Sequence, residues 1–176
     1  MTGEESFHPD TRALLAYGRA LAGAGPAPKK GGADQVLERL LVIERISDGR
    51  LPIRTFGADL VKFFGRDLRE HDFARFFLAP DLQLIHALIG ACAAAGEPAV
   101  ARVGAETACG QAFGAEILLT PLKVDAYLGC RFLAMFQALG GEHLLGGRPI
   151  QILRLASLHP PQAKAPNGMR LVVVND

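Results

Sequence analysis

The chain of 176 residues has only three cysteines and no tryptophan. Cys92, Cys109 and Cys130 are scattered along the sequence and form no CxxC pair. This usage argues against a disulfide scaffold and against a cysteine-ligated metal site, and it favours a reducing cytoplasm. Because buried cysteines behave as small hydrophobic side chains, packing is the preferred role for these residues and redox sensing is the alternative.

An excess of charge of either sign is also missing. Lys and Arg number 19 and Asp and Glu number 18, which leaves a formal net charge of +1. The sequence therefore lacks the basic character of a nucleic-acid-binding domain or a membrane-surface anchor. The most apolar stretch, residues 82–96, contains Gln83 and His86 and is shorter than the roughly 20 residues that a membrane span needs. We expect no nucleic-acid partner and no membrane span.

The hydrophobic residues that are present, 49% of the chain, suffice for the core of one ordinary domain. An amphipathic helix is predicted over residues 11–22, followed by the linker GAGPAPKKGG. Two β-prone runs, LVIERIS and RLPIRTF, are separated by Asp48-Gly49, a pair typical of a type I′ hairpin turn. The pattern after the linker therefore begins with a β-hairpin.

Helical spacing replaces strand spacing from Ala58 onward. Short helices are predicted within residues 58–77, and a longer helix starts near Pro80 and ends before Gly96. Three strands follow, over residues 100–107, 111–123 and 128–138, and the tail contains the strand-like runs RPIQILRLASL and RLVVVND. Both faces of the third strand are partly apolar, so its outer face needs a cover. The N-terminal helix or the C-terminal tail would supply this cover, either within one chain or from a second copy.

This order of elements resembles a PAS domain, and most closely a bacterial, mainly alphaproteobacterial, family of single-domain PAS-like proteins with a preceding helix. The blocks that carry the resemblance lie within about residues 11–158: LLAYGRALAGAG, IRTFGADLVKFFGRDLRE, AEILLTPLK, GCRFLAMFQAL and HLLGGRPIQILRL. A tryptophan that is frequent in the family's N-terminal helix is absent. The order predicts an α+β fold, a PAS-like five-stranded antiparallel sheet with short helices on one face. We expect an N-terminal helix and linker (1–33), a PAS-like domain (34–139) and a C-terminal extension (140–176).

Phenylalanine is enriched, with ten residues in the chain, six of them between Phe56 and Phe77. These rings either fill the core or line a cavity for a small apolar metabolite, since aromatic residues do both. The candidate pocket residues, between the long helix and the inner face of the sheet, are Leu60, Phe64, Phe77, Ile85, His86, Ile89, Phe113, Ile117 and Phe132.

Specific cofactor chemistry has little support in the sequence. His86 lies on the helix from which some PAS proteins bind haem iron, and its alternative role is an ordinary surface or core histidine. A flavin of the light–oxygen–voltage (LOV) type is not expected, because the family-like segment Gly65–Glu70 has Leu68 where a reactive cysteine would be needed. Arg54 and Asp67 are either polar groups at the pocket mouth or structural residues. No catalytic or metal-binding motif is present.

These observations predict a non-catalytic signalling or sensory PAS protein. It would act in trans, as a homodimer and through an unidentified signalling partner, with or without a small ligand in its core. One alternative is a sensor of a small molecule or of haem. Another is a small α+β isomerase-like enzyme, although Glu106, Glu116 and Asp125 show no pairing expected of an acid–base dyad.

Overall fold

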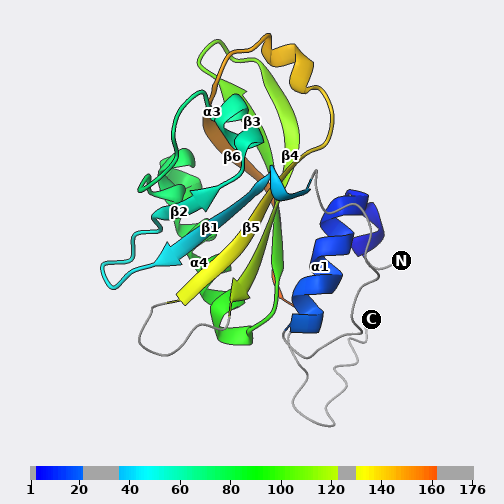
Figure 1. The fold of residues 1–176 in the computed structure, drawn as a ribbon, viewed down its shortest axis with the longest axis vertical. Coiled ribbons are helices and arrows are strands. Elements are labelled where there is room, and N and C mark those ends of the chain that lie inside the picture. The colour runs from blue at the N-terminus through cyan, green and yellow to red at the C-terminus, as the bar shows by residue number, and fades with distance from the viewer. Residues whose placement is uncertain (1–2, 22–35, 123–129, 162–176) are drawn as a thin grey trace, which may run out of the picture.

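The computed structural model describes residues 3–21, 36–122 and 130–161 and contains one six-stranded antiparallel sheet (Figure 1). The spatial order of the strands is β2-β1-β5-β4-β3-β6. Their bounds are β1 (Leu40–Arg45), β2 (Ile53–Phe56), β3 (Ala99–Thr107), β4 (Ala112–Leu122), β5 (Cys130–Ala138) and β6 (Ile150–His159). The predicted α+β fold is confirmed. All five predicted strands are present, and β6, from the expected C-terminal extension, pairs with β3 as a sixth.

The helices match the expected order. They are α1 (Pro9–Leu21), α3 (Ala58–Phe64) and α4 (Ala79–Ala95), with 3-10 turns η1 (Gly3–Ser6), η2 (Phe73–Phe76) and η3 (Glu142–Leu145). The long helix has Pro80 in its first turn and ends at Gly96, which adopts φ +64° and donates its N–H to the Cys92 carbonyl. Gly65 ends α3 in the same left-handed conformation. A glycine therefore ends each of these two helices, because glycine adopts positive φ without a steric penalty.

The hairpin between β1 and β2 is present, but its predicted type I′ turn is wrong. The Ile46 N–H donates to the Arg50 carbonyl and the Gly49 N–H donates to the Ile46 carbonyl, at 3.2 and 3.0 Å. Gly49 has φ +85°, whereas Asp48 is not among the positive-φ residues. The loop therefore has three residues, and only the last is left-handed. The Asp48 carboxylate accepts hydrogen bonds from Arg50, which stabilises this longer turn.

The inner face of the sheet carries the main core. Helices α3 and α4 and the turn η2 pack against it, and the buried side chains of these elements form one cluster with the inward residues of all six strands. On α4 the buried side chains are those of Ile85, Leu88, Ile89 and Cys92. Burial of this apolar surface is the main favourable contribution to folding.

The outer face is covered by α1, which lies on the opposite side of the sheet from α4 (Figure 1). Phe7 and Leu15 form a second buried cluster with Val100, Leu118 and Met135, which come from β3, β4 and β5. The predicted cover of the outer face is thus confirmed, and the chain's own N-terminal helix provides it. No helix among the described residues is long and apolar enough to cross a membrane.

Gly18 permits this close contact, and a larger residue there should clash with the sheet. A Cβ at Gly18 would lie 2.8 Å from both Cγ2 and Oγ1 of Thr120 on β4. Gly18→Ala should therefore lower the free energy of unfolding, measured with urea, although alanine usually stabilises a helix interior by about 1 kcal/mol. Gly90→Ala on α4 is the matched control, because a Cβ there meets nothing within 4 Å, and it should stabilise the domain. Thr120→Ala should rescue the Gly18 variant, and stabilisation by Gly18→Ala alone would contradict the close contact between α1 and β4.

Candidate functional site

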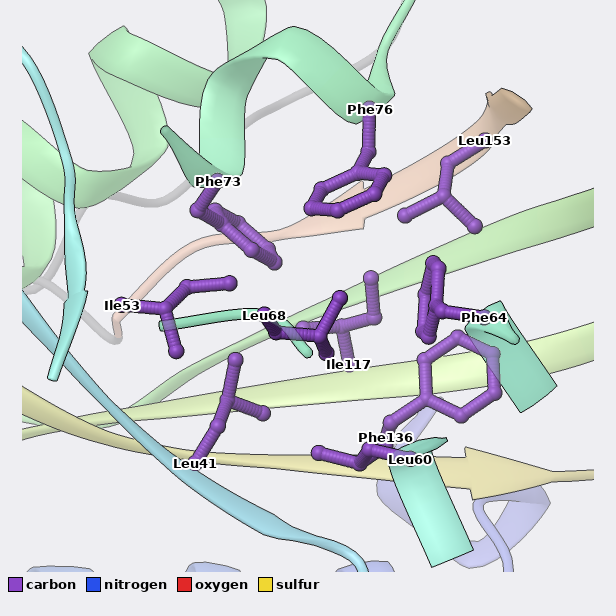
Figure 2. Close-up of a pocket in the computed structure, with 10 residues that line it drawn as sticks. All are labelled: Leu41, Ile53, Leu60, Phe64, Leu68, Phe73, Phe76, Ile117, Phe136 and Leu153. Atoms are coloured by element: carbon purple, nitrogen blue, oxygen red, sulfur yellow. The ribbon is translucent and has the colours of Figure 1, made fainter. Parts of the chain in front are cut away.

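A small apolar pocket lies between the sheet and the short helices (Figure 2). It encloses about 10 Å³, close to the lower limit of space that one water molecule needs. Side chains from both layers point toward one another across it. They are all apolar: Leu41, Ile53, Leu60, Phe64, Leu68, Phe73, Phe76, Ile117, Phe136 and Leu153.

The structure places three of the predicted pocket residues, Leu60, Phe64 and Ile117, on this lining. Another five are buried in the surrounding core and are not among the lining residues: Phe77, Ile85, Ile89, Phe113 and Phe132. The remaining aromatic members, Phe73, Phe76 and Phe136, were not in the predicted set. They come from η2 and β5, and their ring centroids lie close to those of other phenylalanines, for example 4.8 Å between Phe64 and Phe76.

The structure corrects the prediction that His86 lines the pocket. Its side chain is exposed on α4, whereas its neighbours Ile85 and Ile89 are buried, so it does not line the pocket. A haem ligand would have to point inward from this helix. His71, the other histidine of this region, is also exposed.

The pocket does not fit the cofactors that PAS-like folds suggest. Haem needs an axial ligand, and flavin needs polar groups for its ring and tail, whereas every lining side chain is apolar. Leu68 itself is buried and lines the pocket. A space of about 10 Å³ is far smaller than the several hundred Å³ of ordinary ligand sites, so the residues present fit neither group in this arrangement.

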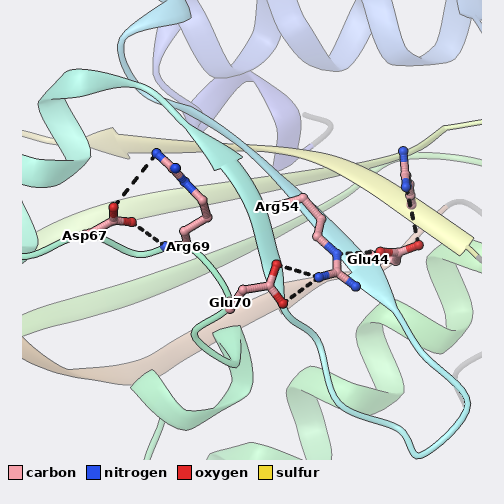
Figure 3. Close-up of polar contacts among 6 residues, drawn as sticks. Glu44, Arg54, Asp67, Arg69 and Glu70 are labelled. Carbon is pink, nitrogen blue, oxygen red and sulfur yellow. Dashed lines mark hydrogen bonds and ion pairs between the residues drawn. The ribbon is translucent and has the colours of Figure 1, made fainter.

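Arg54 and Asp67 have separate polar partners (Figure 3). The Arg54 Nε donates to Glu44 at 2.5 Å, and its Nη1 donates to both carboxylate oxygens of Glu70 at 2.5 Å. Asp67 accepts a hydrogen bond from the Arg69 N–H at 2.8 Å, within its own loop. Each of the two residues therefore has a polar partner within the chain.

Glu44 lies between two arginines on the outer side of the hairpin. A hydrogen bond from Arg54 lowers the pKa of the Glu44 carboxyl, and the positive charges of Arg54 and Arg131 act in the same direction. Arg131 is the cross-strand neighbour of Glu44 on β5. This group joins β2, β1 and β5 and stabilises the folded state above the ordinary pKa of a glutamate, with the stabilisation lost as the pH falls.

A second polar group, which the sequence did not reveal, lies under the N-terminal segment. Glu116 is 0% exposed, and its carboxylate accepts hydrogen bonds from Arg102 at 3.1 and 3.2 Å and from the His8 N–H at 3.0 Å. The Arg102 guanidinium also donates to the carbonyl and hydroxyl of Ser6, at 2.5 and 3.0 Å, and lies over the Phe7 ring. One ion pair thus contacts three consecutive residues.

His159 borders this group from β6. Its ring meets the Phe7 ring edge-on, with 4.8 Å between centroids. Burial lowers the pKa of the His159 imidazole, and the positive charge of Arg102 lowers it further. The negative charge of Glu116 acts in the opposite direction, and the net lowering of the pKa favours the neutral imidazole beside Arg102.

Cys92 and Cys109 differ in burial, and this difference predicts different reactivity. The Cys92 thiol donates to the carbonyls of Glu97 and Leu119, and burial raises its pKa to about 12. Cys109 is exposed in the turn between β3 and β4. Because the thiolate is the reactive species, a thiol reagent at neutral pH should modify Cys109 quickly and Cys92 only after unfolding. Mass spectrometry of the labelled peptides, with Cys109→Ser as control, measures this, and native-state labelling of both at equal rates would contradict it.

Comparison with known proteins gives the family. A family model described as "PAS domain" matches residues 6–137, which is most of the chain. The chain belongs to the PAS domain family. No curated protein matches it.

Solved structures of other proteins show distant similarity. They include the light-state structure of the blue-light photoreceptor Aureochrome1 LOV, at 12% identity over 72% of this chain and 91% of that chain, with a TM-score of 0.45. A light–oxygen–voltage domain studied with a flavin analogue has 14% identity over 64% and 84%, with a TM-score of 0.46. An RNA-binding light–oxygen–voltage receptor has 11% identity over 82% and 59%, with a TM-score of 0.47.

Proposed function

We propose that this PAS domain is a non-catalytic signalling protein that acts in trans, through self-association and through contact with a signalling partner. The observation that carries the proposal is the filled core. Ten apolar side chains leave about 10 Å³ between them, so this pocket has little room for a cofactor or substrate. The outer face, by contrast, has a separate cover, α1, over the apolar side chains of Val100, Leu118 and Met135.

The outer face is therefore the proposed interaction surface. A helix that is joined to the sheet through a small cluster can move without opening the main core, because the two clusters lie on opposite faces. Contact with a second copy or with another protein would then use the same face. We propose that the protein acts in the cytoplasm, in agreement with its three free cysteines. We also propose that it belongs with the bacterial single-domain PAS-like proteins.

A small apolar ligand is the second candidate, and the all-apolar lining of the pocket favours it over a polar metabolite. Such a ligand would have to displace the phenylalanine rings before it could enter. It would change signalling only if it bound two arrangements of the sheet and helices with different affinities. A tenfold shift between the two arrangements needs a difference of about 1.4 kcal/mol in binding free energy.

An absorption spectrum and the native mass of the purified full chain test these proposals together. We expect no visible absorption band, no retained small molecule, and a mass that rises from monomer to dimer across a concentration series. A chromophore or metabolite retained in stoichiometric amount would favour the sensor alternative. A monomer at every concentration would contradict self-association, and turnover of a metabolite by the purified protein would contradict a non-catalytic role.

A further inference from the structure

The loop that joins α3 to η2, residues 65–72, places one side chain in the small pocket. Nine of the ten lining residues lie on strands, on α3 or on η2, and the tenth, Leu68, lies in this loop. Leu68 is 1% exposed, whereas residues 65–67 and 69–71, on both sides of it, are exposed. A single buried leucine therefore lies between the pocket and the exposed surface of the loop.

The backbone of residues 66–69 is only loosely tied to the rest of the domain. For the described residues, the backbone hydrogen bonds of this segment stay within the loop. Gly65 and Glu70, at its two ends, have φ +65° and +63°. The Glu70 N–H is the first to reach the sheet, where it donates to the Ile53 carbonyl of β2 at 2.8 Å. A residue with a side chain rarely adopts positive φ, so contacts with the sheet must hold Glu70 in place.

One ion pair supplies such a contact. Both carboxylate oxygens of Glu70 accept hydrogen bonds from Arg54 of β2 at 2.5 Å (Figure 3). Arg54 also donates to Glu44 of β1, which fixes its guanidinium on the sheet. Asp67 instead accepts the Arg69 N–H, inside the loop. The contact of Glu70 therefore ties the loop to the sheet, and that of Asp67 does not.

Outward movement of residues 66–69 would withdraw Leu68 and enlarge the pocket (Figure 2). The closed pocket encloses about 10 Å³. Removal of a leucine side chain from an apolar core leaves on the order of 150 Å³, a space that stays dry and accepts benzene. The rings of Phe64, Phe73 and Phe76, which border the same space, would then have room to move, as entry of a ligand requires.

We propose that residues 65–72 form a lid on the pocket, which the Arg54–Glu70 ion pair holds closed, and that the open lid admits one single-ring or short-chain hydrocarbon. The ligand class follows from the all-apolar lining and from the volume of one leucine. The choice of ligand rests on the second candidate function, whereas movement of the lid does not. In the wild type the lid is mostly closed, which weakens the apparent affinity in proportion to the open fraction.

Labelling of a thiol at position 68 measures opening of the lid. Leu68→Cys is treated with a thiol reagent at neutral pH, and mass spectrometry follows this position and Cys92 in the same molecules. Cys92 is buried on α4 in the same core, so its labelling reports unfolding of the domain. We expect position 68 to react at least ten times faster than Cys92, because the lid opens without unfolding of the sheet. Equal rates would overturn the lid.

Two further substitutions in the Leu68→Cys background test the ion pair. Glu70→Gln removes the charge that faces Arg54 and should raise the labelling rate at position 68 about two- to fivefold, the effect of a partly exposed ion pair. Asp67→Asn is the matched control, because it removes a charge from the same loop without loosening the loop from the sheet. It should leave the rate unchanged, and equal effects of the two substitutions would contradict the role of the Arg54–Glu70 pair.

Benzene tests the ligand class. It should raise the labelling rate at position 68, because it occupies the open pocket, and it should not raise the rate at Cys92. Imidazole, a polar ring of similar size, should change neither rate. Faster labelling of position 68 than of Cys92 with no effect of benzene would leave the lid in place and would contradict entry of a hydrocarbon.

A second variant keeps the test decisive if Leu68→Cys does not fold. Leu68→Met nearly conserves the volume of the side chain and is treated with hydrogen peroxide. The buried Met135 is the reference in the same molecules. We expect faster oxidation at position 68 than at Met135, and oxidation of both at the same rate would overturn the lid.

Discussion

Replacing Phe136 with alanine should lower the free energy of unfolding by about 3–5 kcal/mol, the usual cost of removing a buried phenylalanine side chain. Phe136 is 3% exposed and lines the small pocket. Its ring centroid lies 5.6 Å from that of Phe63, 5.8 Å from that of Phe64 and 6.3 Å from that of Phe113. Removal of this ring takes away contacts with three others and leaves a cavity that the surrounding side chains fill only in part.

Urea denaturation of the wild type and the variant measures the effect. Tyr17→Ala is the control, since Tyr17 is 41% exposed and its replacement should change stability by no more than about 0.5 kcal/mol. The enlarged cavity should also bind a small apolar probe such as benzene, which would raise the melting temperature of Phe136→Ala and leave that of the wild type unchanged. A loss below about 1.5 kcal/mol would indicate that the aromatic core is loosely packed.

The order of the elements was predictable because each boundary depends on local chemistry. Gly65 and Gly96 end helices at positive φ, and Pro80 lies in the first turn of α4, so their roles follow from backbone preferences alone. The type I′ turn at Asp48-Gly49 was wrong because the same pair also suits a three-residue loop with only Gly49 left-handed. Loop length is set by strand pairing, which the two residues do not specify.

The pocket was predicted less well than the core. Apolar spacing identifies residues that face inward, but it does not identify which of them border the small gap that remains after packing. Phe77 and Phe136 are both buried, and only Phe136 lines the pocket. His86 was uncertain for a similar reason, because a position beside Ile85 fits either edge of the buried stripe. Its exposed position excludes it from the pocket.

The pairing of Glu116 with Arg102 could not have been predicted from the sequence. It stands among apolar residues in AEILLTPLK, which is unusual for a carboxylate, but its partner Arg102 lies 14 residues earlier. Only the register of β3 with β4 places the two opposite each other. Contact with Ser6 and His8 depends further on the path of the chain before α1, which no local pattern determines.

Deletion of residues 1–24 should lower the free energy of unfolding by about 3 kcal/mol. Burial of Phe7 and of Leu15 contributes roughly 1.5–3 kcal/mol each, and the entropy of ordering the segment offsets part of this sum. The deletion also exposes Val100, Leu118 and Met135 to water. A lower midpoint in urea denaturation of the truncated chain is the measurement.

Substitutions at two neighbouring residues of α1 test whether the helix stabilises the fold through its contact with the sheet. Leu15 is buried against the sheet, whereas Ala16 is exposed. Leu15→Glu should approach the destabilisation caused by the deletion, because a charge at this position prevents contact with the outer face. Ala16→Glu introduces the same charge one residue later and should change stability by less than about 0.5 kcal/mol. Equal stability of the truncated chain and the wild type would mean that α1 contributes nothing to the folded state, and the outer face would then need a different cover.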